Sequence, residues 1–352
     1  MNGDVYVKLR EFLDTLGSGY PATPTGVELK ILKKLFSPDE AELTMKLNKE
    51  PEELSAIAAR LGEKEKALGS QLEDMAQKGL IYRVKKEGKT YYSAVQFIIG
   101  IYEFQLKTLD KEFSQMIEEY IPHYGMSLMS VKTKQLRVIP VESSVDSSTK
   151  IETYNKIRIL FNTQDKFSVA PCICRKEQDF LGKKCTRPVE TCIGLGEIAE
   201  YYIENKMARP ISREDALKLI DQAEESALVL CPTNSQEILS VCCCCPCCCP
   251  TLKYSKMMPR PVDFILSYYQ ASIDPEVCIA CGQCIQRCQM GAVKAGKDSS
   301  EMIDGRCIGC GLCIAGCPTE AISLMAKEEM RVPPQDFMQG TLKNIEAERG
   351  VC

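Results

Sequence analysis

The sequence predicts an α+β protein of several domains: a helical N-terminal domain ending in a β-hairpin, a central cysteine-rich α/β domain, and a small C-terminal domain built on a repeat. Three observations support this. The first 171 residues contain none of the 21 cysteines and carry helical patterns of apolar residues. Seven cysteines stand within the eight residues from Cys242 to Cys249. Two cysteine motifs of identical spacing then follow near the C-terminus.

The N-terminal domain, expected over residues 1–125, shows four helical segments and a hairpin. The helices are predicted over 26–36, 37–47, 51–62 and 64–80. Ser37 and Pro38 are suited to a helix cap and first helical residue, and Pro51 opens the third helix in the same way. In the fourth helix, Leu68, Leu72, Met75 and Ala76 share one side. Residues 80–94 read as strand, charged turn and strand, so the order of elements is that of a winged helix-turn-helix domain.

The central domain, expected over residues 126–258, mixes strands and helices. Residues 135–141 and 166–170 read as strands. Ser212 is a candidate helix cap with Asp215 three residues later, and an apolar helical face follows. The strand-like residues 228–230 then lead into Cys231.

Twelve cysteines of the central domain raise three possibilities: disulfides, a thiol-rich metal sponge, or iron–sulfur ligands. Disulfide geometry disfavours pairing of adjacent residues, and clustered cysteines in a reducing compartment more often bind metal. Pro246 breaks the run with a turn, so the run can serve two sites on either side of the backbone. Four ligands per cubane allow at most three clusters, and one or two are expected here. The candidate metal ligands are Cys172, Cys174, Cys185, Cys192, Cys242, Cys244, Cys245, Cys247, Cys248 and Cys249.

The first four of these cysteines lie within 21 residues and suit the ligand set of one cluster. Arg175, Lys183, Lys184 and Arg187 lie among them, and cationic neighbours lower thiol pKa values and offset cluster charge. The alternative is a surface that carries a few structural cysteines.

The C-terminal domain, expected over residues 259–331 and followed by a tail over 332–352, contains the repeat. The segments "CIACGQCIQRC" from Cys278 and "CIGCGLCIAGC" from Cys307 agree at seven of eleven positions. Both have the spacing C-x2-C-x2-C-x3-C, which is that of bacterial two-cluster ferredoxins. Gly282 and Gly311 suit the tight loops that bring three thiolates together.

In this pattern the fourth cysteine of each motif, expected at the start of a helix, ligates the other cluster. One [4Fe–4S] cluster is therefore assigned to Cys278, Cys281, Cys284 and Cys317. The other is assigned to Cys288, Cys307, Cys310 and Cys313. A pair of zinc knuckles is the alternative, but two three-plus-one sets fit zinc poorly.

Taken together, these features resemble a family of multi-cluster 4Fe–4S ferredoxin-like proteins of anaerobic bacteria and archaea with an N-terminal winged-helix-like domain. The resemblance rests on "PCICR", the following "ETC", the cysteine run, Pro259–Pro261 and the two ferredoxin motifs. It implies cluster binding and electron transfer. The family commonly has Asn where this chain has Cys243, and it has no invariant ligand at the position of Cys231, so neither residue is assigned.

Composition limits the function further. A net charge of −4 gives no bulk electrostatic case for nucleic acid or an anionic membrane. We see neither a signal peptide nor a transmembrane stretch, so a cytoplasmic protein is expected. The chain has one histidine and no motif of a catalytic site, so we assign no catalytic residue and expect a non-catalytic subunit. An iron with an open coordination position in the central cluster can carry out redox chemistry on a small substrate, so whether the protein is an enzyme is left open.

The leading hypothesis is an electron-transfer protein that relays electrons through several clusters to or from a partner oxidoreductase. The first alternative is a redox-sensing winged-helix transcription regulator. The predicted recognition helix, residues 63–78, has four acidic and three basic residues, which disfavours DNA, whereas the hairpin from Arg83 to Lys89 is net +3. A protein-docking role for this domain is preferred. The second alternative, a carrier that donates clusters to other proteins, fits the repeated ferredoxin motif poorly.

Overall fold

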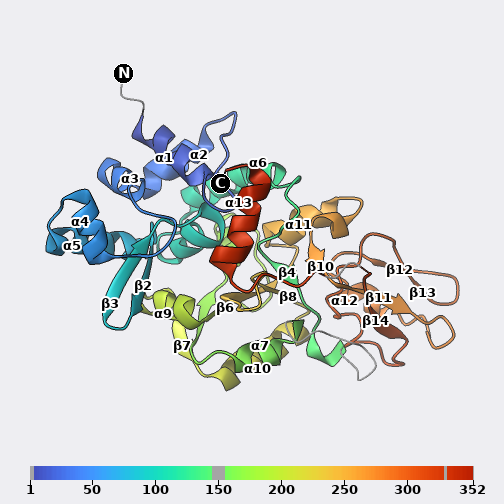
Figure 1. The fold of residues 1–352 in the computed structure, drawn as a ribbon. Helices are drawn as coiled ribbons and strands as arrows, with labels where there is room; N and C mark the ends of the chain where they lie inside the picture. The colour runs from blue at the N-terminus through green and yellow to red at the C-terminus, as the bar shows by residue number, and fades with distance from the viewer. Residues whose placement is uncertain (1–3, 145–154, 329–330, 352) are drawn as a thin grey trace.

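The computed structural model describes residues 4–144, 155–328 and 331–351. Figure 1 shows the N-terminal helices on one side of the molecule, the cysteine-motif lobe on the other, and the central sheet and its helices between them. This arrangement places the two cysteine-rich parts next to each other.

The N-terminal part is helical with one small sheet. Its elements are α1 (Val5–Asp14), α2 (Val27–Leu35), α3 (Pro38–Thr44), β1 (Glu52–Glu53), α4 (Leu54–Leu61), α5 (Glu65–Gln77), β2 (Tyr82–Lys86), β3 (Lys89–Ser93), η1 (Phe97–Ile101), η2 (Glu103–Lys107) and α6 (Lys111–Ser127). The sheet has the order β1-β3-β2 and is antiparallel. The four expected helices and the hairpin are therefore present in the expected order.

A local signal explains the start of α3. Ser37 caps α3, and its side chain and that of Glu40 satisfy each other's backbone N–H groups. The predicted face of α5, from Leu68 to Ala76, is buried. The expected start of the third helix at Pro51 is wrong, because α4 begins at Leu54. Glu52 and Glu53 pair instead with Tyr92 and Tyr91 of the hairpin, and this pairing holds them extended.

The central part is a five-stranded sheet of order β7-β5-β6-β9-β8, antiparallel throughout. Its strands are β5 (Phe167–Pro171), β6 (Glu190–Leu195), β7 (Arg209–Ile211), β8 (Val229–Pro232) and β9 (Ser240–Cys244). The helices are α7 (Ile157–Asn162), α8 (Ile173–Phe180), α9 (Gly196–Glu204), α10 (Arg213–Glu225) and α11 (Pro250–Met257). Ser212 and Asp215 form the expected capping box at α10. The expected strand over 135–141 is reduced to β4 (Arg137–Val138) with single bridges on either side.

Antiparallel register gives the sheet two different faces. Ile193, Val241 and Leu230 belong to the aliphatic core that α10 covers, and Val169 pairs with Ile193 on the same face. The opposite face carries Cys192, Cys242 and Cys231, which are paired across three neighbouring strands. Side chains alternate along a strand, so Cys243 points to the aliphatic face.

The C-terminal lobe consists of short elements around the two cysteine motifs. They are η5 (Pro261–Asp263), β10 (Leu266–Ser267), β11 (Tyr269–Ile273), α12 (Gln283–Arg287), β12 (Val293–Ala295), β13 (Ser300–Met302) and β14 (Ile322–Ala326). β11 pairs with β14, and β12 pairs with β13. β10 pairs in parallel with β4 and so joins the lobe to the central part.

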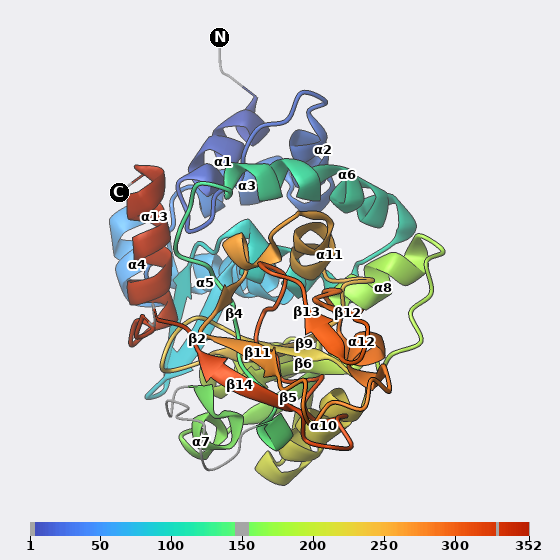
Figure 2. The same ribbon diagram turned by 90° about the vertical axis from the view of Figure 1, so that its right-hand side faces the viewer.

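The end of the chain folds back on the N-terminal part, where Figure 2 shows α13 (Lys343–Arg349) running along one side of the molecule. η6 (Phe337–Leu342) precedes it. Glu346 accepts a hydrogen bond from the Gly17 N–H at 2.6 Å, and Arg349 pairs with Asp14 at 2.8 Å. The expected tail therefore holds the first helices in place. Within the described residues, no helix is long and apolar enough to span a bilayer.

Candidate metal centres

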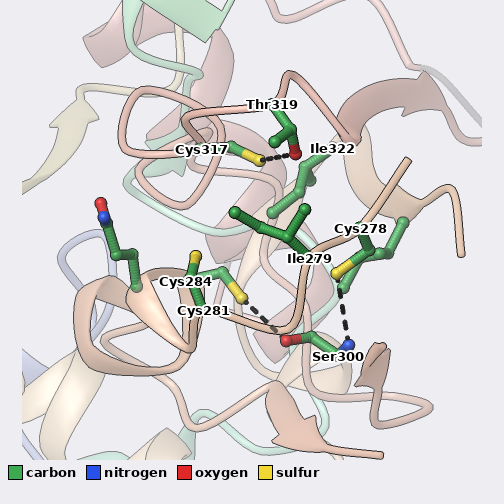
Figure 3. Close-up of a pocket in the computed structure, with 10 residues that line it drawn as sticks. Cys278, Ile279, Cys281, Cys284, Ser300, Cys317, Thr319 and Ile322 are labelled. Carbon is green, nitrogen blue, oxygen red and sulfur yellow. Dashed lines mark hydrogen bonds between the residues drawn. The ribbon is translucent and has the colours of Figure 1, made fainter. Parts of the chain in front are cut away.

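The first candidate centre is a cavity that four thiols of the C-terminal lobe share. Cys278, Cys281, Cys284 and Cys317 line it together with Ile279, Ser300 and other residues. Figure 3 shows the four cysteine side chains around Ile279, with Cys317 approaching from the second motif. These are the four ligands expected for one cluster, and they come from segments 33 residues apart (317 − 284).

The backbone explains how three of these thiols meet. Gly282 has φ of 75°, in the left-handed region, and α12 begins directly after it. One expectation is wrong: Cys288 lies at the end of α12 and not at the start of a helix. The turn into α12 uses Gly282 as its N-cap, so the short helix lies between the third and fourth cysteines of the motif.

Backbone N–H groups point at several thiols. Ser300 N donates to Cys278 Sγ at 3.4 Å, Ala271 N to Cys307 Sγ at 3.2 Å, and Ala292 N to Cys288 Sγ at 3.1 Å. Such donors stabilise thiolate charge and tune the potential of a bound cluster. The donor set is all sulfur and has N–H support, so these residues fit a [4Fe–4S] group.

The second expected set also lies together. Burial raises the pKa of Cys313, and the neighbouring thiols Cys310, Cys307 and Cys288 raise it further. Cys284 of the first cavity contributes to the same shift, so the two sets are neighbours.

This second set borders the central part. Val141 N donates to the carbonyl oxygen of Cys310 at 3.0 Å. Gly311 has φ of 75°, and a side chain there would meet Ser144 Oγ at 2.1 Å. Burial raises the pKa of Cys310, with smaller contributions from other thiols that include Cys231 of the central sheet. The second motif thus approaches the cysteines of the sheet.

We call the thiols on and beside the sheet face opposite the aliphatic core the sheet-face thiols; they are Cys172, Cys174, Cys192, Cys231, Cys242, Cys244 and Cys249. Side-chain contacts connect Cys172 with Cys174, and Cys192 with Cys242. Cys244 contacts Cys231, Cys242 and Cys249. Cys172, Cys174, Cys192 and Cys242 are half-buried. An all-thiol set of this kind fits an iron–sulfur group.

A second central group, which we call the turn tetrad, consists of Cys185, Cys245, Cys247 and Cys248. All four sulfurs lie within 4.8 Å of one another. The structure therefore does not unite Cys185 with Cys172, Cys174 and Cys192, as their closeness in sequence suggested. The loop after α8 carries Cys185 away from them to the turn that follows β9.

Arg175 lies between the two central groups and is 3% exposed. Its Nη2 donates to the carbonyl oxygen of Cys243 at 2.9 Å and to Cys245 Sγ at 3.5 Å, and Nη1 donates to Thr191. Contact with the Cys248 thiol, aided by Cys247 and Arg175, lowers the pKa of Cys245 to about 4. The buried Arg175 side chain thus offsets thiolate charge in both central groups.

A half-buried acid also borders the sheet-face thiols. Burial raises the pKa of Glu103 to about 8, although the Gly100 N–H donates to its carboxylate at 2.8 Å, and the charge of Cys242 raises it further. The folded protein then binds a proton at Glu103 that the unfolded chain releases above pH 4.5.

This difference predicts that stability falls as pH rises between these two pKa values, by up to about 5 kcal/mol. Glu103→Gln should remove that loss, so its melting temperature, measured without oxygen, should change less than that of the parent chain between pH 5.5 and 8.5. Glu50→Gln is the matched control, because Glu50 is 61% exposed. Equal pH dependence in Glu103→Gln and the parent chain would contradict the assignment.

Sequence reasoning missed three participants. Cys231 was unassigned, yet it contacts Cys244 and neighbours Cys310. Glu103 had no signal in the sequence, and the quoted "ETC" gave no sign that Thr191 contacts Arg175, because both roles depend on tertiary packing. Cys242 and Cys244 were assigned as ligands from the sequence. The two-residue period of a strand could also have placed both of them on one face.

Comparison with known proteins gives one family match. No curated protein and no solved structure matches the chain. Residues 271–324 match the family model described as a 4Fe-4S dicluster domain, the segment that holds both cysteine motifs. Together with the grouped thiols, this match supports an iron–sulfur protein with a 4Fe-4S dicluster domain at residues 271–324.

Proposed function

We propose that this protein relays electrons between its ferredoxin-like lobe and a partner oxidoreductase, through iron–sulfur clusters in the lobe and in the central part. The observation that carries the proposal is the continuity of the thiol groups. Bound at these thiols, the clusters supply reversible one-electron transfer. The chain's own residues hold them close together, shield them and set the charge around them.

Three neighbouring groups form the series. The first cavity adjoins the second set through Cys284 and Cys313. The second set adjoins the sheet-face thiols through Cys310 and Cys231. We assign one cluster to each set of the lobe and one to the sheet-face thiols, which makes three.

The outer end of the series suits contact with a redox partner. Cys281 is exposed at the first cavity. Val277 and Ile279 beside it are 44% and 62% exposed. An apolar surface next to an accessible cluster site allows close approach of another redox protein and excludes water from the contact.

The N-terminal part fits a docking or structural module better than a DNA reader. Arg83 is 2% exposed and is paired with Glu73 and Glu204. Lys85 pairs with Glu204, Lys86 with Glu197, and Lys89 with Glu53. The basic residues of the hairpin are therefore neutralised by carboxylates of this chain, largely from α9.

The helix before the hairpin is also engaged with α9. Tyr201 Oη donates to the carbonyl oxygens of Ala76 and Ile81, at 2.9 Å each. We infer a winged-helix-like module that docks on the central part. The alternative, a redox-sensing DNA-binding regulator, needs these cations free for phosphate contacts.

The expected composition of the purified protein tests the relay. Prepared without oxygen, the chain should contain about twelve irons and about twelve acid-labile sulfides, four of each per cubane. About eight of each would restrict the clusters to the lobe and would overturn the central site. A gel shift of genomic DNA fragments by the holo or apo protein would instead favour the regulator.

A further inference from the structure

The turn tetrad differs in geometry from the other thiol groups. Cys185 Sγ lies 3.6 Å from Cys247 Sγ, which lies 3.1 Å from Cys245 Sγ and 3.8 Å from Cys248 Sγ. Among the described residues, no other group of three or more metal-binding side chains is as compact. The tetrad thus stands apart from the first cavity, whose four thiols also face one space.

These distances distinguish one metal ion from a cluster. Four thiolates at about 2.3 Å from a single tetrahedral ion lie about 3.8 Å from one another. In a cubane each thiolate binds a different iron at a separate corner, so the sulfurs must lie farther apart. The tetrad matches the single ion.

The backbone around the tetrad is built to present these sulfurs together. Pro246 interrupts the run, and the N–H groups of Cys248 and Cys249 donate to the carbonyl oxygen of Cys245 at 3.3 and 3.0 Å. This tight turn brings Cys245, Cys247 and Cys248 to one side. Cys249 instead faces Cys244 among the sheet-face thiols.

The fourth sulfur comes from a loop with little regular structure, residues 181–189. Lys183 of this loop pairs with Glu118 at 2.8 Å, and Arg187 Nη1 donates to the carbonyl oxygen of Ala227 at 3.2 Å. Cys185 lies between these two anchors. A metal bond there would attach the loop to the turn after β9.

We propose that Cys185, Cys245, Cys247 and Cys248 bind a single Zn²⁺ ion in a closed tetrahedral site, separate from the iron–sulfur clusters. An all-thiolate, four-coordinate set is typical of structural zinc. Arg175, in contact with Cys245 Sγ, offsets part of the negative charge of four thiolates around a divalent ion. The ion attaches the loop of residues 181–189 to the turn after β9.

Metal analysis of the full chain tests this, with protein produced without oxygen in medium that contains both iron and zinc. The expected result is about one zinc per chain, with an X-ray absorption spectrum of four sulfur neighbours at about 2.3 Å and no iron neighbour. Absence of zinc from the folded, iron-loaded protein would overturn the proposal.

Variants separate the tetrad from the clusters. Cys185→Ser combined with Cys247→Ser should lower zinc from about one to near zero per chain and leave iron and sulfide unchanged. Cys185→His should retain zinc, because three thiolates and an imidazole also form a tetrahedral site. Cys243→Ala, on the aliphatic face, should change neither metal.

The failure of this proposal is distinguishable from failure of the electron relay. Loss of about four irons and four sulfides in the double variant would show that the tetrad binds a cluster. Loss of about one iron without sulfide would show a single iron and overturn the choice of zinc. A total of about eight irons beside one intact zinc would refute the central cluster alone.

Discussion

Cys284→Ala is expected to remove about four irons and about four acid-labile sulfides per chain, the content of one cubane. Cys284 is 6% exposed, and its sulfur faces the cavity that it shares with three other cysteines. Alanine offers no ligand atom, and within the part of the chain that the structure describes no thiol besides these four lines this cavity. The result is measured by iron and sulfide analysis and by electron paramagnetic resonance of the reduced protein.

Cys243→Ala is the matched control for Cys284→Ala, because Cys243 is equally buried, at 2% exposure, but faces the aliphatic core. It should retain the full iron content. If Cys284→Ala kept all its iron, the assignment of the first cavity would be refuted. Loss of all iron in both variants would instead mark a folding defect.

Arg175→Met is expected to destabilise the protein by about 3 kcal/mol, because it leaves thiolate charge buried without its cation. Methionine keeps much of the side-chain volume, so the effect reports on charge and hydrogen bonds. Arg175 donates to the carbonyl oxygen of Cys243, to Cys245 Sγ and to Thr191. Loss of a positive charge beside a redox site also disfavours reduction, so the potential of the central cluster should fall. Urea unfolding without oxygen and redox titration measure the two effects.

Two further variants test the role of Arg175. Arg175→Lys keeps the charge, but lysine cannot donate to several acceptors at once. The redox potential of this variant should therefore stay closer to that of the parent chain than its stability does. Arg209→Met removes an arginine that is 56% exposed and paired with Glu190, and should cost less than about 1 kcal/mol. Equal losses in Arg175→Met and Arg209→Met would contradict a special role for the buried cation.

Local patterns in the sequence predicted the four helices between residues 26 and 80, the caps at Ser37 and Ser212 and the ferredoxin-type motifs, but not the start of α4. Ser37 and Ser212 cap helices as expected, since a capping box needs only residues three apart. The spacing of cysteines in each motif likewise dictates which thiols meet in one loop. The crossed set with Cys317 was predictable from the repeat, and in the structure these four thiols line one cavity. The family match over 271–324 covers the same segment.

Tertiary structure alone decided how the seven-cysteine run divides. Strand register across β6, β9 and β8 places Cys242 beside Cys192 and Cys231 and turns Cys243 to the opposite face. The Pro246 turn directs the next thiols to Cys185, which is 62 residues from Cys247 in the chain. The ion pairs between the basic residues of the hairpin and α9 likewise had no signal in the sequence. The sequence by itself showed that the chain carries thiols suited to binding metal, and which of these cysteines form motifs within a short segment. The partners of each remaining thiol depended on long-range pairing, because register and packing bring together residues whose separation carries no local signal.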